Sequence, residues 1–213
     1  MMNALDTYKA IATYEGVRIS NICDIKAKCL QYDNCSKKSK SEILDFDGAA
    51  HTYEKELGTQ TPQSVDAIAV DRAGELLILI EKKTWWNFLF HLNDKDKASP
   101  IEAALVKVGK YDLKEKYEST RRICEYITSE KDLFLSLPHV FVFLTELEDI
   151  DPTAGFATML ASLAHTSSTV DYTIQQPIVA GMKHHLSTVP CKKSRYLNCM
   201  ELDGFINNPS SFG

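Results

Sequence analysis

The stretch SVDAIAVDRAGELLILIEKK, residues 64–83, decides the fold. Two apolar runs flank the turn sequence DRAG, an arrangement that is typical of a β-hairpin. The second run is almost continuously apolar, as in a central strand that is covered on both faces. Because the turn lies at residues 72–74, the register of the hairpin places Asp66 opposite Glu81.

The hairpin ends in charged residues, although its strands look buried. An unpaired ion is costly to bury, so Glu81, Lys82 and Lys83 either reach water at the strand end or belong to a paired site. Two carboxylates side by side repel each other, and a hard divalent cation between them removes the repulsion. Asp66 and Glu81 are therefore candidate ligands of Mg²⁺ or Mn²⁺.

The lysines near this pair suggest a phosphodiester substrate. Strand alternation places Lys83 on the same face as Glu81 and directs Lys82 away from it. An ammonium group beside a metal site can orient or deprotonate a water, or neutralise charge that develops on a phosphate. Lys82, Lys107 and Lys110 are candidates for contact with nucleic acid, and the alternative for these three is a solvated face.

Helices and further strands are expected around the hairpin. Together they predict an α/β or α+β fold, in which helices flank a mixed central sheet. Helical periodicity, capping residues and apolar runs predict helices at 3–35, 47–57, 100–128 and 151–165, and strands at 43–46, 139–144, 172–181 and 195–202.

A chain of 213 residues fits a single domain. Within residues 1–213 we expect a helical N-terminal segment at 1–39, a core at 40–146, and a C-terminal extension of helix and strand at 147–213.

The order of these motifs resembles the core of the PD-(D/E)xK nuclease superfamily: an Asp, an apolar hairpin, a Glu-x-Lys motif, then a helix and a strand. The resemblance implies a restriction-endonuclease-like αβββαβ core. It implies Asp66 and Glu81 as metal ligands and Lys83 as the catalytic lysine. It also implies a further glutamate from the first helix, for which Glu54 and Glu56 are the candidates.

The chain departs from the family pattern in three places. Pro62 does not directly precede Asp66, and Lys82 stands where the family usually has an apolar residue. Only a loop is expected between Leu57 and Val65, so the first core strand of the family has no assigned segment.

The resemblance implies a metal-dependent nuclease that hydrolyses phosphodiester bonds of DNA or RNA, with nucleic-acid processing or defence as the biological setting. The alternative is a catalytically inactive nuclease-like scaffold that binds a protein partner as an assembly or inhibitor subunit. The net charge of −5 favours this alternative, because non-specific binding to nucleic acid relies on Lys and Arg.

Composition also bears on location. No apolar run approaches the about 20 residues that a membrane span requires. The N-terminus lacks the basic start and apolar core of a signal peptide. We therefore expect a cytoplasmic protein without a membrane segment.

Overall fold

The computed structural model describes residues 2–26, 28, 35, 38–92, 99–149 and 166–212. The helix expected at 151–165 lies outside these residues. Among the described helices, none is long and apolar enough to cross a membrane.

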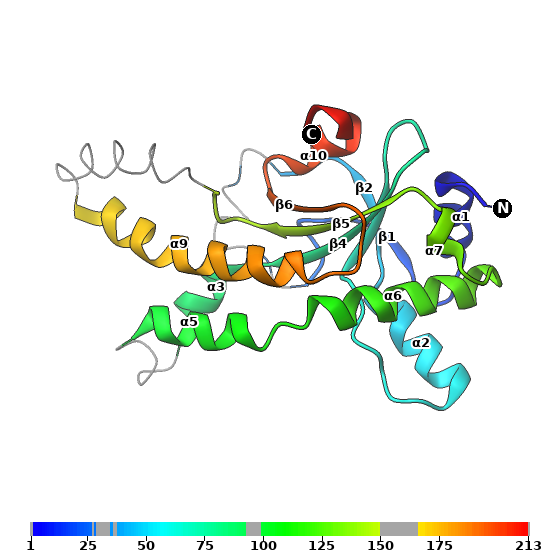
Figure 1. Ribbon diagram of the computed structural model, residues 1–213, viewed down its shortest axis with the longest axis horizontal. Helices are drawn as coiled ribbons and strands as arrows, with labels where there is room; N and C mark the ends of the chain where they lie inside the picture. The colour runs from blue at the N-terminus through cyan, green and yellow to red at the C-terminus, as the bar shows by residue number, and fades with distance from the viewer. Residues whose placement is uncertain are drawn as a thin grey trace.

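A six-stranded mixed sheet forms the centre of the protein, which confirms the expected fold class (Figure 1). The first four strands pair antiparallel, and the last three run parallel to one another. In sheet order, which is also chain order, the strands are β1 (Arg18–Asn21), β2 (Glu42–Asp45), β3 (Ala67–Val70), β4 (Leu77–Lys83), β5 (His139–Thr145) and β6 (Ser194–Asn198).

The predicted hairpin is confirmed in β3 and β4. Ala67 pairs with Ile80, so the next positions outward are Asp66 and Glu81. The turn is held by the side chain of Asp71, whose Oδ1 accepts hydrogen bonds from two backbone amides at 2.8 Å. This local chemistry fixes the register and hence which side chains share the open end of the hairpin.

Helices cover both faces of the sheet. Figure 1 shows α5 (Pro100–Gly109), α6 (Leu113–Thr128) and α9 (Thr166–Ser187) along one side, and α10 (Leu202–Asn207) on the other. Alternate residues of β4 enter two separate cores. Leu77 and Leu79 belong to the first core, on the side of the sheet covered by α5, α6 and α9. Ile78 and Ile80 belong to the second core, on the side covered by α10. The remaining described helices are α1 (Ala4–Ala12), α2 (Asp47–Leu57), α3 (Trp85–Phe90), α7 (Leu133–Ser136) and the 3₁₀ helix η2 (Pro209–Phe212).

The helix expected over residues 100–128 is two helices. Helix α5 ends at Gly109, and α6 begins after Asp112, whose side chain accepts a hydrogen bond from the amide of Glu115 at 2.8 Å. The buried face of α6 is the one that the periodicity predicted, and it includes Leu113 and Tyr117. The break matters because it brings residues 107–112 over the end of the hairpin.

Two further segments differ from the predicted secondary structure. The N-terminal helix ends at Ala12, and residues 18–21 form the edge strand β1, because Gly16 takes a left-handed conformation (φ 88°) and turns the chain toward β2. Residues 172–181 lie in helix α9 instead of a strand, where Ile178 is buried in the first core. Val179 is buried in the same core, so tertiary packing overrides the strand preference of these two β-branched residues.

The strand before α2 supplies an antiparallel neighbour to the hairpin. Strand β2 lies at residues 42–45, close to the expected 43–46, and it pairs with β3 through Leu44 and Ile68. Helix α2 is therefore inserted between two neighbouring strands, with Gly58 as its left-handed C-cap. Asp47 is the first residue of α2 and makes no cap, since Phe46 holds the N-cap position.

Candidate active site at the end of the β3–β4 hairpin

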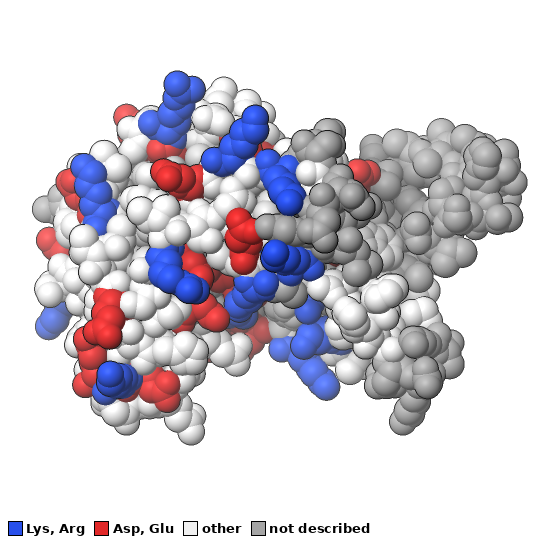
Figure 2. Space-filling view, turned by 180° about the vertical axis from the view of Figure 1, so that it is seen from behind, with Lys and Arg blue, Asp and Glu red and all other residues white. Residues whose placement is uncertain are grey.

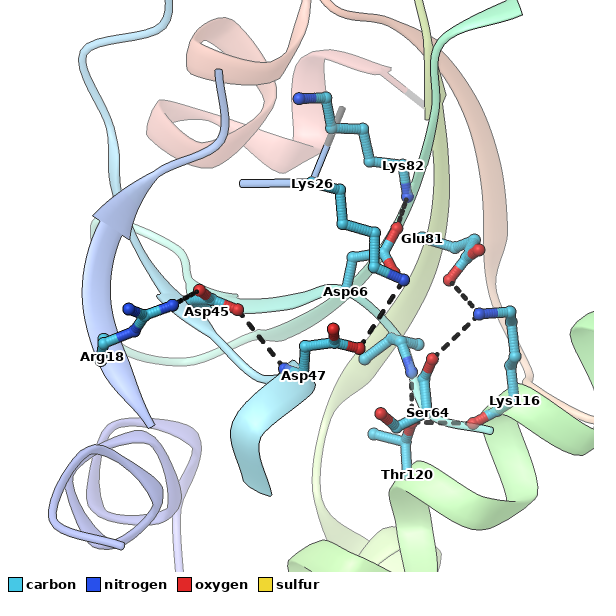
Figure 3. A network of polar contacts seen from close by, with 11 residues as sticks. Arg18, Lys26, Asp45, Asp47, Ser64, Asp66, Glu81, Lys82, Lys116 and Thr120 are labelled. Carbon is cyan, nitrogen blue, oxygen red and sulfur yellow. Dashed lines mark hydrogen bonds and ion pairs between the residues drawn. The ribbon is translucent and has the colours of Figure 1, made fainter. Parts of the chain in front are cut away.

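The two predicted carboxylates meet at the end of the hairpin, in the polar network of Figure 3. Asp66 and Glu81 are almost fully buried, with 1% and 2% of their surfaces exposed. The amide of Asp66 donates to the carbonyl of Ile80 at 3.0 Å, which extends the ladder by one residue. Its Oδ2 accepts a hydrogen bond from the amide of Lys82 at 2.8 Å. The backbone of β4 therefore fixes the orientation of this carboxylate.

Two lysine ammonium groups face the carboxylates. Figure 3 shows Lys26 reaching between Asp66 and Asp47, and Lys116 reaching Glu81 from helix α6. The Nζ atom of Lys26 forms an ion pair with Oδ1 of Asp66 and lies 3.7 Å from Oδ1 of Asp47. The Nζ atom of Lys116 lies 3.1 Å from Oε2 of Glu81. Apart from these ion pairs, Asp66 Oδ1 and Glu81 Oε2 have no hydrogen bond within the described residues.

The buried carboxylates perturb each other. Burial, followed by repulsion from Asp66, raises the pKa of Glu81, although Lys116 and Lys26 pull it down. Burial lowers the pKa of Lys26, but the charge and hydrogen bond of Asp66, together with the charges of Glu81 and Asp47, outweigh this effect, so the net pKa is raised. Ionising both Asp66 and Glu81 therefore costs free energy, and a cation that approaches both carboxylates reduces that free-energy cost.

Helix α6 anchors the segment that carries Asp66. The hydroxyl of Thr120 accepts a hydrogen bond from the amide of Val65 at 3.0 Å, and Nζ of Lys116 donates to the carbonyl of Ser64 at 3.1 Å. Both α6 residues lie on its buried side, one turn apart. In the sequence, the helical spacing of Lys116 from Leu113 and Thr120 is the signal that places this lysine on the buried side of α6.

The predicted catalytic lysine lies against an aromatic cluster. The Nζ atom of Lys83 is 5.4 Å from the ring centroid of Trp85, 5.2 Å from that of Phe88 and 5.9 Å from that of Tyr111. Burial, followed by the nearby charge of Lys107, lowers the pKa of Lys83. A lysine with a lowered pKa exchanges protons more readily near neutral pH, as general acid–base chemistry requires.

Lys82 points to the opposite face, as strand alternation predicts. Its Nζ atom donates to the carbonyls of Ile22 and Ile25, both at 2.9 Å. The ammonium of Lys82 therefore serves to hold residues 22–25 against the strand end. Its predicted contact with nucleic acid stays a prediction.

An open pocket of about 310 Å³ lies over Glu81. Lys and Arg side chains gather beside carboxylates near the middle of the face in Figure 2. Lys107, in the last turn of α5, and Lys110, in the break before α6, line the pocket together with Tyr111. Six lysines and two carboxylates line this pocket. The ammonium of Lys82 is turned to the opposite face, but the other five lysines still outnumber the carboxylates and give a positive lining, which suits a polyanion. Its lysines are Lys26, Lys82, Lys83, Lys107, Lys110 and Lys116, and its carboxylates are Glu81 and Asp112.

The additional acids proposed on α2 make contacts of their own. Glu56 accepts a hydrogen bond from the hydroxyl of Tyr14 at 2.6 Å, and Glu54 accepts one from the hydroxyl of Thr61. The acid of α2 that does approach the ion pair of Asp66 is Asp47, at the start of the helix. No local pattern in the sequence places Lys26 beside Asp47.

The donor set fits a hard divalent cation in part. Asp66 and Glu81 each offer a carboxylate oxygen that lacks a hydrogen bond in the described structure, and Mg²⁺ and Mn²⁺ prefer such oxygens. Across the described ranges, no three His, Cys, Asp or Glu side chains lie together as a metal site. Two carboxylates therefore match an open site of the kind that Mg²⁺ forms, in which water and substrate phosphates supply the other ligands.

We compared the chain with protein-family models, curated protein sequences and solved structures, and none of the three comparisons found a match.

Proposed function

We propose that the protein is a metal-dependent nuclease that hydrolyses phosphodiester bonds of DNA or RNA, using Mg²⁺ or Mn²⁺. The observation that supports this best is the buried pair Asp66 and Glu81 beneath a pocket with six lysines. The carboxylates supply oxygen donors for a cation, and the lysines attract the phosphates of a substrate. The proposed location is the cytoplasm, and nucleic-acid processing or defence is the proposed setting.

Each residue of the site has a proposed task. Asp66 and Glu81 would hold the ion, which when bound supplies Lewis-acid stabilisation of the phosphate and a more acidic water. Lys83 lies on the same side of β4 as Glu81 and has a lowered pKa, so it can accept a proton from the attacking water or stabilise the charged phosphate. Lys107 and Lys110 would bind backbone phosphates on either side of the scissile bond.

The test is cleavage of single-stranded and duplex DNA and RNA in Mn²⁺ by the wild type, Glu81→Gln and Lys83→Met. Lys183→Met is the matched control, because Lys183 forms an ion pair with Asp149 outside the pocket. We expect both site variants to lose at least roughly a hundredfold in rate, since each removes a group that acts in the transition state. Cleavage by Glu81→Gln and Lys83→Met at the rate of the Lys183→Met control would overturn the proposal.

One observation favours the second candidate, a catalytically inactive scaffold that binds a protein partner. The ammonium groups of Lys26 and Lys116 already neutralise the two carboxylates, so the fold has a charge-balanced core here without a metal. Calorimetric titration with Mn²⁺ separates the candidates. A nuclease binds Mn²⁺ in the wild type and loses this binding in Glu81→Ala. A scaffold binds none, and its partner complex survives both Glu81→Ala and Lys83→Met.

A further inference from the structure

The segment that carries Lys26 is fixed at its backbone. Ile22 and Ile25 are buried in the core on the second side of the sheet, with 1% and 3% of their surfaces exposed. Their carbonyls accept the two hydrogen bonds from Lys82. The backbone of Lys26 itself is left-handed, with φ 52°. A non-glycine residue in this conformation is uncommon, and here the anchored segment holds Lys26 beside the carboxylate pair.

The side chain of Lys26 is placed differently from that of Lys116. The Lys116 side chain is 14% exposed and also donates to the carbonyl of Ser64. The Lys26 side chain is 39% exposed, lines the pocket, and has only carboxylates as partners among the contacts described. Lys116 is therefore a fixed partner of Glu81, whereas Lys26 can swing into the pocket by changes of its side-chain rotamer alone.

The ammonium of Lys26 and a metal ion would compete for the same oxygen. Oδ1 of Asp66 is buried without a hydrogen bond among the described residues, whereas Oδ2 already accepts one from the amide of Lys82, so Oδ1 is the more available oxygen for a further cation. That Oδ1 is the atom with which Lys26 forms its ion pair. An ammonium group and a metal ion in contact with the same buried oxygen would repel each other strongly, so the two cations exclude each other.

We propose that Lys26 is an internal counter-cation that must leave Asp66 before a divalent cation binds there. This inference rests on the proposed metal-dependent function and adds a control of metal affinity to it. The free energy of metal binding includes the cost of breaking the Lys26–Asp66 ion pair, so the chain sets the metal concentration at which the site fills. By linkage, bound metal displaces the ammonium into the pocket.

The first test is calorimetric titration of Mn²⁺ into the wild type, Lys26→Met and the control Lys183→Met. We expect Lys26→Met to bind Mn²⁺ at least tenfold more tightly than the wild type, and Lys183→Met to match the wild type. Binding by Lys26→Met alone supports Lys26 as the counter-cation, but it overturns the proposed metal-dependent function, because the wild type then binds no Mn²⁺. Equal dissociation constants in all three proteins overturn the inference and leave the proposed metal site intact. Absence of binding in all three overturns the metal site itself.

The second test keeps a positively charged lysine at position 26 and does not depend on how well Lys26→Met folds. Lysines are reductively methylated with ¹³C, and the Lys26 signal is identified by its absence in Lys26→Arg. We expect saturating Mg²⁺ to shift the Lys26 signal and to leave the Lys183 signal in place. A Lys26 signal that stays fixed while calorimetry shows Mg²⁺ bound overturns the inference.

Discussion

The Nζ atom of Lys116 and the Oε2 atom of Glu81 lie 3.1 Å apart, in an ion pair that joins helix α6 to strand β4 inside the protein. The side chains are 14% and 2% exposed, so little water solvates either charge. Removing one partner of such a pair leaves the other charge uncompensated, which costs much more than removing both.

We therefore expect Lys116→Met to lower the free energy of unfolding by roughly 3 kcal/mol. Glu81→Gln should cost less, because the Lys116 ammonium that it leaves behind is 14% exposed and still donates to the carbonyl of Ser64, whereas Lys116→Met leaves a carboxylate that is only 2% exposed. The double variant should be more stable than Lys116→Met alone, since no unpaired carboxylate remains. Urea unfolding of the four proteins gives the coupling energy directly. Strictly additive effects of the two substitutions would contradict a buried ion pair.

The sequence was sufficient for the hairpin because its determinants are local. A turn sequence and two apolar runs set the register, and the register brings Asp66 and Glu81 together. Strand alternation directs Lys82 to the carbonyls of Ile22 and Ile25 and Lys83 to the ring of Trp85. The buried face of α6 followed from helical spacing in the same way.

The rest of the site depends on contacts between distant segments. Lys26 meets Asp66 from 40 positions earlier in the chain, and no local pattern indicates that contact. The break before α6 was missed because residues 100–128 keep helical periodicity across it. Helix α9 was interpreted as a strand because its β-branched residues favour one locally, while Gly181 allows close packing on Val108 of α5.

Close backbone contact between Gly16 and Gly48 predicts an unusual response to alanine. A Cβ atom added at Gly48 would lie 2.0 Å from the carbonyl oxygen of Gly16, so the turn before β1 would have to move. Alanine inside a helix normally stabilises by about 0.5–1 kcal/mol relative to glycine. Here we expect Gly48→Ala to destabilise by about 1–3 kcal/mol, as overpacking does.

Gly109→Ala is the matched control for this substitution. Gly109 also lies in a helix, and a Cβ atom there meets no atom within 4 Å. We expect this variant to be at least as stable as the wild type in thermal unfolding. A Gly48→Ala protein as stable as Gly109→Ala would show that the turn and α2 are not in contact.

Stability should fall in acid because of His139, which is buried at the start of β5. Its Nδ1–H donates to the carbonyl of Leu137 at 2.7 Å, and its Nε2 accepts from the hydroxyl of Tyr117 at 2.8 Å. Burial lowers the pKa of His139, the hydrogen bond to Leu137 opposes this, and the charge of Lys192 lowers it further. The neutral ring is therefore the form that the fold accommodates.

The direction of the pH effect follows from linkage. The unfolded chain takes up a proton at a higher pH than the folded protein, so the contribution of His139 is complete above a pH of about 6.5 and is lost as the pH falls below it. We expect the free energy of unfolding to drop between pH 7 and pH 5 more in the wild type than in His139→Gln. Equal drops in the two proteins would assign the acid sensitivity to other groups.

Lys107 and Lys110 predict how nucleic acid binds if the pocket is the binding site. Both lysines line the pocket, Lys107 from the last turn of α5 and Lys110 from the break before α6. With EDTA present to prevent cleavage, a fluorescent oligothymidylate should bind the wild type with an affinity that falls as salt rises. Each lost phosphate contact should reduce the slope of log K against log salt by about 0.7 for a single strand. Lys107→Ala/Lys110→Ala should therefore bind more weakly at low salt and show a shallower slope.

Lys183→Ala removes the same charge from an exposed lysine outside the pocket and should bind like the wild type. Weakening by the double variant without a change of slope would indicate a folding defect instead of lost phosphate contacts. Weak binding by the wild type, unchanged in all variants, would remove nucleic acid as the ligand of the lysine pocket. It would leave the charge-balanced carboxylate pair as a feature of a protein-binding scaffold.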